Sequence, residues 1–323
     1  MHRLSHDLLL VLGITSACYT KPDPLPTATA TGSVAAEHRE LIAAGLPASF
    51  DWRSLAGVTS PIRSQYLPSW CGSCWAHAVT SSLADRVNVL RQRSDYNGGR
   101  GSVMLAVQNY LDCAKLAGTC DGGSWERAFE FASSSGVCDD SCAPYKGVDG
   151  ECGRHQESMC QLIFENRTSV PVAGARRFKV KEWGYLNASK DGDTTSNATA
   201  IVEMQAEIMA RGPIVCSMMT KDDHNPLGAW HCYEGGVYRT KSTFKSTNHV
   251  ISLLGWGEDE SGVPYWVGRH SGGTIFGEEG FFRIERGVNA LNIESHCGYA
   301  TVLDPDPPRG DASHLPCENG VPR

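Results

Sequence analysis

The chain has 323 residues, 41% of them hydrophobic, so it is long enough to bury a large core in one or two domains. Its formal charge is -7, from 29 basic and 36 acidic side chains that are scattered along the sequence. The absence of a basic stripe argues against a protein that binds nucleic acid or an anionic membrane surface.

The 13 cysteines indicate an oxidising compartment, unless they bind metal. Cys71 and Cys74 form a lone CxxC, and no second cysteine or histidine pair follows at zinc-finger distance. Disulfides are therefore the favoured use of the cysteines, and we predict neither a metal nor a cofactor.

The N-terminal segment is typical of a secretory signal. An apolar run from Leu8 to Ile14, too short to span a membrane, precedes Thr15-Ser16-Ala17, which suits cleavage before Cys18. Ser16-Ala17-Cys18 also resembles a bacterial lipid-attachment site. Three N-glycosylation sequons favour a eukaryotic secretory route instead. They are at Asn166, Asn187 and Asn197.

Composition suggests where the folded body begins and ends. Residues 20–36 are rich in Pro, Thr and Ala, which is typical of a linker or pro-segment, and the body is expected to start near Leu46. A Pro-rich stretch from Asp304 begins a tail with few apolar residues. We therefore predict a signal peptide (1–17), a short propeptide (18–45), one folded domain (46–303) and a flexible tail (304–323).

Two helices and three strands are predicted inside this domain. Apolar residues recur at helical spacing from Trp75 to Arg93, with the helix N-terminus at Cys74, and a second helix runs through 201–209 until Gly212-Pro213 ends it. Short runs rich in Val, Ile and aromatic residues, separated by Gly-rich turns, predict antiparallel strands. They span 249–256, 264–269 and 280–286. A helical first half and a stranded second half predict an α+β chain whose two lobes face each other across a cleft.

Cys74 is the candidate nucleophile. A helix N-terminus favours the thiolate form of a cysteine, and a histidine elsewhere in the chain can share its proton. Among the eleven histidines, His249 opens an apolar strand, the rigid element that a base needs, whereas His77 lies nearly a full turn from Cys74. Taken alone, Cys74 could equally be a buried thiol or a disulfide partner of Cys71.

A family resemblance decides between these alternatives. The run from Ser69 to Ala76 contains Cys-Gly-Ser-Cys-Trp, and it resembles the nucleophile signature of papain-like cysteine peptidases. Asn248-His249-Val250, followed by Gly255-Trp256-Gly257, resembles the family's catalytic-histidine strand. The resemblance implies a helical N-terminal lobe, a β-barrel-like C-terminal lobe and a cleft between them. It also implies that Cys74 attacks, His249 is the base and Gln65 completes the oxyanion hole.

A three-residue insertion, Tyr66-Leu67-Pro68, separates Gln65 from the nucleophile run. It resembles the mini-loop of the cathepsin X (cathepsin Z) group, which are lysosomal carboxypeptidases, so we expect these three residues to contact substrate. That group places a histidine after the glutamine to bind the substrate's C-terminal carboxylate, and Tyr66 can donate only a neutral hydrogen bond. Cys18 resembles the group's propeptide cysteine, which bonds reversibly to the nucleophile and keeps the zymogen inactive. The alternative is that Cys18 is lost with the signal peptide.

The resemblance also implies disulfides and partners. It pairs Cys71 with Cys120, Cys113 with Cys152, and Cys216 with Cys297. The expected partners are peptide or protein substrates and cystatin-like inhibitors, and we expect a monomer, in a lysosome-like acidic vesicle or outside the cell.

Two departures affect the residue that orients His249. Where the family has Asn-Ser-Trp-Gly, this chain has His270-Ser271-Gly272-Gly273. A neutral His270 can still accept the His249 N–H, but a protonated one would repel it, and Gly272 removes the apolar cover. We expect a weakened peptidase, with a silent homologue that binds peptides or a receptor as the alternative. A thiol-disulfide oxidoreductase is disfavoured, because no thioredoxin-like pattern surrounds Cys71 and Cys74.

Overall fold

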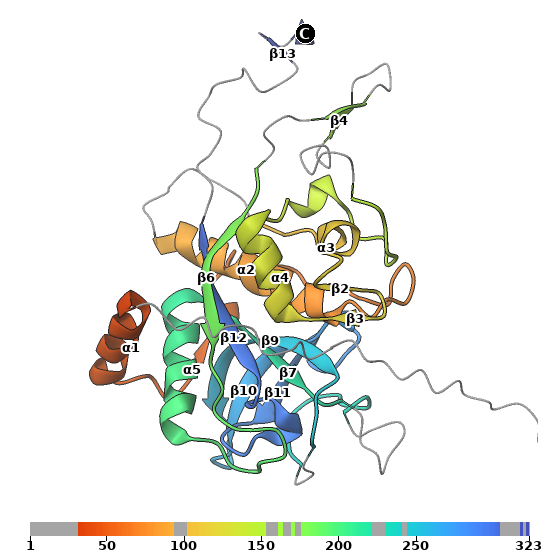
Figure 1. The fold of residues 1–323 in the computed structure, drawn as a ribbon. Coiled ribbons are helices and arrows are strands. Elements are labelled where there is room, and N and C mark those ends of the chain that lie inside the picture. The colour runs from red at the N-terminus through yellow and green to blue at the C-terminus, as the bar shows by residue number, and fades with distance from the viewer. Residues whose placement is uncertain are drawn as a thin grey trace, which may run out of the picture.

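The computed structural model describes residues 32–93, 102–152, 161–163, 169–171, 176–220, 230–240, 244–303, 317–318 and 321–322. The longer helices among them are α1 (Gly32–Ala44), α2 (Cys74–Arg93), α3 (Val107–Cys113), α4 (Trp125–Ser134) and α5 (Ala198–Arg211). Short 3-10 turns are η1 (Trp52–Ser54), η2 (Asp140–Cys142) and η4 (Ala290–Asn292). Helices and a mainly antiparallel sheet gather in two lobes, which confirms the predicted α+β class (Figure 1).

The N-terminal lobe is built around α2. Its apolar residues Trp75, Val79, Leu83 and Val87 are at most 2% exposed and share one core with α3 and α4. Ser124 caps α4, because its side chain accepts a hydrogen bond from the Arg127 N–H. Two minor pairs, β2 (Gly118–Thr119) with β3 (Gly122–Gly123) and β4 (Gln161–Ile163) with β5 (Ser169–Pro171), lie in this half of the chain.

The C-terminal lobe is an eight-stranded sheet in the order β6-β12-β7-β9-β10-β11-β8, with β1 paired to β9. Its strands are β1 (Phe50–Asp51), β6 (Lys179–Tyr185), β7 (Ile214–Met218), β8 (Val237–Tyr238), β9 (His249–Glu258), β10 (Pro264–Arg269), β11 (Phe281–Glu285) and β12 (Cys297–Leu303). A last small pair is β13 (Cys317–Glu318) with β14 (Val321–Pro322). Strand β9 lies near the middle of the sheet and packs against α2, so its apolar residues are buried.

Local sequence explains how β1 and α5 are fixed in this lobe. A Cβ at Gly255 would lie 2.4 Å from the Phe50 carbonyl oxygen, so only glycine lets β1 pair with β9. Asn197 caps α5 by accepting the Ala200 N–H, and Gly212, at φ 114°, ends the helix where the sequence predicts. Phe50 and Asp51 are thereby held in the sheet.

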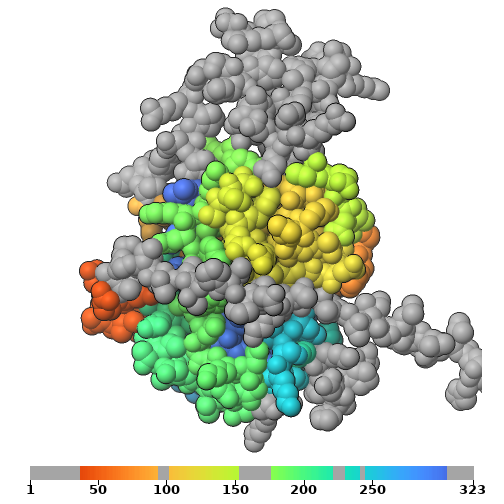
Figure 2. All heavy atoms as spheres, viewed as in Figure 1, coloured from red at the N-terminus to blue at the C-terminus, as the bar shows by residue number. Residues whose placement is uncertain are grey.

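Helix α1 falls within the predicted propeptide and lies on the flank of the C-terminal lobe, beside α5 (Figures 1 and 2). His38 Nε2 is 2.7 Å from Glu207 Oε2, and Arg211 donates to Glu37 at 2.5 Å. Helix α1 therefore contacts the lobe through ionisable side chains. Cys18 lies outside the described residues.

No helix in the described part of the chain is both long enough and apolar enough to cross a membrane.

Candidate active site

Cys74 is the first residue of α2 and is fully buried. The first helical hydrogen bond runs from the His77 N–H to the Ser73 carbonyl, so the N–H groups of the opening turn point toward the region of the thiol. Cys71, three residues earlier, forms a disulfide with Cys120. That disulfide removes Cys71 as a partner for Cys74, and the helix N-terminus favours a thiolate there.

His249 is the first residue of β9, beside Met218 of β7 in the sheet register. Its side chain is 4% exposed, and α2, which begins with Cys74, packs on the same strand. His249 Nε2 is buried without a hydrogen-bond partner among the described residues. The strand thus fixes the backbone of the predicted base, but no hydrogen bond fixes this ring nitrogen.

Gln65 is held by Ser271. The Ser271 hydroxyl donates to Gln65 Oε1 at 2.6 Å, and the Gln65 N–H donates to the Ser271 carbonyl at 2.8 Å. Gln65 Nε2 donates to the Cys71 carbonyl at 3.1 Å. The amide is fully buried and oriented at both ends, which is what an oxyanion donor needs.

The rings of His249 and His270 lie against each other, with centroids 4.7 Å apart and planes 35° apart. His270 Nδ1, like His249 Nε2, has no hydrogen-bond partner among the described residues. The hydrogen bond that we expected from His249 to His270 is therefore not formed in this structure. A ring contact replaces it, because the imidazole is larger than an asparagine amide and lies alongside its neighbour.

His270 is kept neutral by its surroundings. Burial, and then repulsion from His249 and His231, hold the pKa of His270 well below its usual value of 6.5. The repulsion between protonated His249 and protonated His270, which we expected at acidic pH, is thereby avoided.

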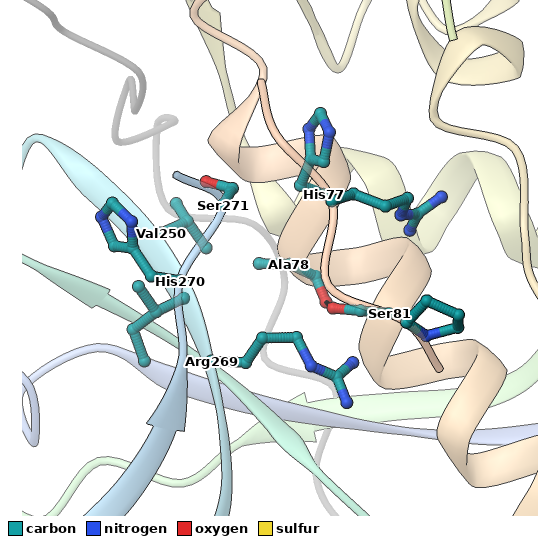
Figure 3. A pocket seen from close by; sticks show the side chains of 10 residues that line it. His77, Ala78, Ser81, Val250, Arg269, His270 and Ser271 are labelled. Carbon is teal, nitrogen blue, oxygen red and sulfur yellow. Dashed lines mark hydrogen bonds between the residues drawn. The ribbon is translucent and has the colours of Figure 1, made fainter. Parts of the chain in front are cut away.

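A small cavity lies between the lobes next to these residues (Figure 3). His77 and Ala78 reach it from α2, and His270 and Ser271 from the segment after β10. Its volume of about 10 Å³ is near the minimum for one water molecule. Burial, and then the charge of Arg63, lower the pKa of His77 to about 3, so the His77 ring is also neutral. Among the described residues no group of His, Cys, Asp or Glu is arranged to hold a metal ion.

Comparisons with known proteins identify the family. A family profile described as papain family cysteine protease matches residues 46–301. The chain belongs to the papain family of cysteine proteases. It is 36% identical to cathepsin Z of Onchocerca volvulus, over 80% of this chain and 78% of the relative. It is 28% identical to a gut-specific cysteine proteinase of Caenorhabditis elegans, over 81% and 75% of the two chains.

Solved structures show the same papain-like fold. A structure from a study of the mite allergens Blo t 1 and Der p 1 superposes with a TM-score of 0.61 at 26% identity, covering 80% of this chain and 71% of that one. Bromelain from Ananas comosus, in complex with the E64 inhibitor, superposes with a TM-score of 0.58 at 24% identity, over 79% and 99% of the chains. These similarities confirm the two-lobe papain fold.

The apolar cover that the family's tryptophan provides was expected to be missing, because residue 272 is glycine. His249 and His270 are nevertheless only 4% and 7% exposed. Phe276 stacks on His270 with 3.9 Å between ring centroids, and Trp230 stands edge-on to His270 at 6.2 Å. The expected exposure is therefore wrong: both rings are buried, and an aromatic residue from further along the chain covers His270.

The mini-loop is at the surface. Tyr66 is 39% and Leu67 69% exposed, and the bond from Leu67 to Pro68 is cis. The Tyr66 N–H donates to Ser64 Oγ, and nearby Trp70 is also exposed. These residues present apolar and phenolic groups that a substrate can contact.

The structure contains the three disulfides that the family resemblance implied, Cys71–Cys120, Cys113–Cys152 and Cys216–Cys297. Cys142 is also disulfide-bonded, whereas Cys138 and Cys232 are free thiols. The sequon residues Asn187 and Asn197 have exposed side chains, and Asn166 lies outside the described residues.

Sequence reasoning missed three residues around the site. Ser271 stood in the stretch that we aligned with the family's Asn-Ser-Trp-Gly, so its contact with Gln65 could have been sought there. Phe276 and Trp230 gave no such signal, because their role depends on where His270 points.

Proposed function

We propose that the protein is an active thiol peptidase that hydrolyses peptide bonds through an acyl-enzyme on Cys74. The observation that carries this proposal is that the chain combines a cysteine at the start of helix α2 with a buried Gln65 amide oriented by Ser271. Cys74 Sγ attacks the peptide carbonyl carbon, and its backbone N–H and the Gln65 amide receive the oxyanion. His249 gives its proton to the departing amine, and it then takes one from the water that releases the acid product.

Modification of Cys74 tests this proposal. An epoxysuccinyl inhibitor should label the folded, processed protein, and Cys74→Ala should abolish both labelling and peptide hydrolysis. Cys232→Ala is the matched control, because that thiol is exposed and free. His249→Ala should lower kcat/KM by roughly 100-fold or more, as expected for loss of a general base.

A silent homologue is the second candidate, and the hydrogen-bond-free nitrogens of His249 and His270 favour it. Labelling of Cys74 without turnover of any peptide would support that candidate. Absence of labelling would contradict both the reactive thiolate and the peptidase.

We further propose that the enzyme removes C-terminal residues from peptides. The mini-loop and the 36% sequence identity to a cathepsin Z support this proposal. A peptide should be cleaved faster than its C-terminal amide, and Tyr66→His should widen the difference, because a charged donor binds a carboxylate more strongly than a phenol does. Equal cleavage of the two substrates by both proteins would refute the carboxypeptidase assignment.

The cellular setting completes the proposal. A signal peptide, glycans on Asn166, Asn187 and Asn197, and a Cys18 disulfide that silences Cys74 until reduction would suit a zymogen of an acidic vesicle or the cell exterior. Peptide substrates and cystatin-like inhibitors would bind the monomer in its cleft.

A further inference from the structure

Residues 270 and 272 both differ from the family pattern, and the geometry links the two differences. A Cβ built on Gly272 would lie 2.8 Å from His270 Nδ1 and 3.3 Å from Phe276 Cβ. The first distance is too short for a real contact, so even alanine at 272 would displace the His270 ring. The imidazole at 270 and a side chain at 272 therefore exclude each other in this arrangement.

The space above Gly272 is closed by Phe276. Its ring stacks on that of His270, with the two planes 20° apart. It also contacts Trp230, with 5.5 Å between the ring centroids. Trp230 is 1% exposed, so Phe276 rests on a fixed partner. His270 is thus in contact with the rings of Phe276, His249 and Trp230.

We propose that Phe276 is a positioning residue that holds His270 against His249, and that Gly272 supplies the room this arrangement needs. The proposal rests on the proposed thiol-peptidase function, since His249 is the base being positioned. Aromatic stacking favours offset, near-parallel rings of this kind and restricts the motion of His270 without any hydrogen bond.

Because His270 is held away from solvent, its protonation is also controlled. The titratable groups that face it are His249 on β9 and His231 beside Trp230, both of which disfavour a second positive charge. The neighbouring cation Arg269 is turned away, because it donates to Asp85 and Ser60. If Phe276 were lost, water would reach His270 and allow it to be protonated. The positive charge on His270 would then repel the imidazolium form of His249 and disfavour it.

Alkylation of Cys74 by iodoacetamide across pH tests the proposal, because it reports the thiolate-imidazolium pair whether or not peptides are hydrolysed. Phe276→Ala should slow alkylation below pH 6 by roughly 10-fold and lower kcat while changing KM little, a smaller loss than the roughly 100-fold or more expected when the general base itself is removed. Phe276→Leu, which keeps the apolar volume, should lie in between. Ile275→Ala is the control, because Ile275 is 95% exposed on the same loop.

A second pair of variants tests the link to Gly272. Gly272→Trp alone should reduce alkylation at least as much as Phe276→Ala, and His270→Asn combined with Gly272→Trp should recover it, because the smaller amide leaves room. A wild-type alkylation profile in Phe276→Ala, or a double variant no better than Gly272→Trp, would overturn the proposal. If the wild-type protein is alkylated but hydrolyses no peptide, the proposed function is refuted. The comparison of alkylation among these variants would still test the role of Phe276.

Discussion

The Ser271 hydroxyl fixes the oxygen end of the Gln65 amide, because Ser271 Oγ donates to Gln65 Oε1 at 2.6 Å. Gln65→Ala should lower kcat by about 100-fold, the usual effect of losing one oxyanion donor. Ser271→Ala should lower it by roughly 10-fold, because the amide remains but can turn away. Separate measurement of kcat and KM checks both, with Ser261→Ala in the exposed β9–β10 turn as the control. A kcat within twofold of wild type for Ser271→Ala would contradict the prediction.

At this scale the sequence predicted the identity of the central residues but not how they meet. Cys74 lies in a contiguous motif at the start of a helical repeat, so local sequence was enough to place it. The position of His270 depends on rings from residues 230, 249 and 276, which come from three separate segments. Only the packed side chains show that a ring contact has replaced a hydrogen bond.

At the scale of elements, the contact between α1 and α5 gives a prediction about the stability of the protein. Burial alone would raise the pKa of Glu207, but Arg86 and the hydrogen bonds from His38 and Arg211 lower it to about 2. Glu207→Gln would leave Arg86 buried without its counter-charge and should destabilise the protein by about 3–5 kcal/mol. His38→Ala leaves Glu207 paired with two arginines, so it should cost only about 1 kcal/mol. Urea unfolding of the full chain measures both.

Equal losses for these two variants would show that α1, and not the Arg86 ion pair, stabilises this region. The sequence did not predict α1, because residues 20–36 were assigned to a linker from their Pro, Thr and Ala content. The helix begins inside that stretch, at Gly32, and its anchors are on α5, more than 160 residues away. By contrast, α2 and β10 begin and end where the pattern predicted, because their burial follows a local period.

At the scale of the whole molecule, buried charges connect elements that are distant in sequence. Arg269 on β10 pairs with Asp85 on α2 at 2.7 Å, and Arg86 pairs with Glu207 on α5 at 2.8 Å. In addition, His296 Nε2 lies 2.8 Å from Glu126 Oε1 on α4. Nothing in the sequence around His296 indicated this role. Such pairs orient the two lobes that line the cleft, and composition cannot reveal which charges meet.

Acid stability follows from His77, which is 4% exposed between the lobes. Its pKa falls from 6.5 to about 3 on folding, so the unfolded chain binds the extra proton over that range. The folded state is therefore penalised as pH drops below about 6.5, by up to about 1.4 kcal/mol per pH unit. His77→Phe should reduce the stability lost between neutral pH and the acidity of a lysosome-like vesicle. Urea midpoints at the two pH values measure the slope, with the wild-type protein as the reference. An unchanged slope in His77→Phe would mean that His77 already binds its proton in the folded protein, which is incompatible with a dry interface between the lobes.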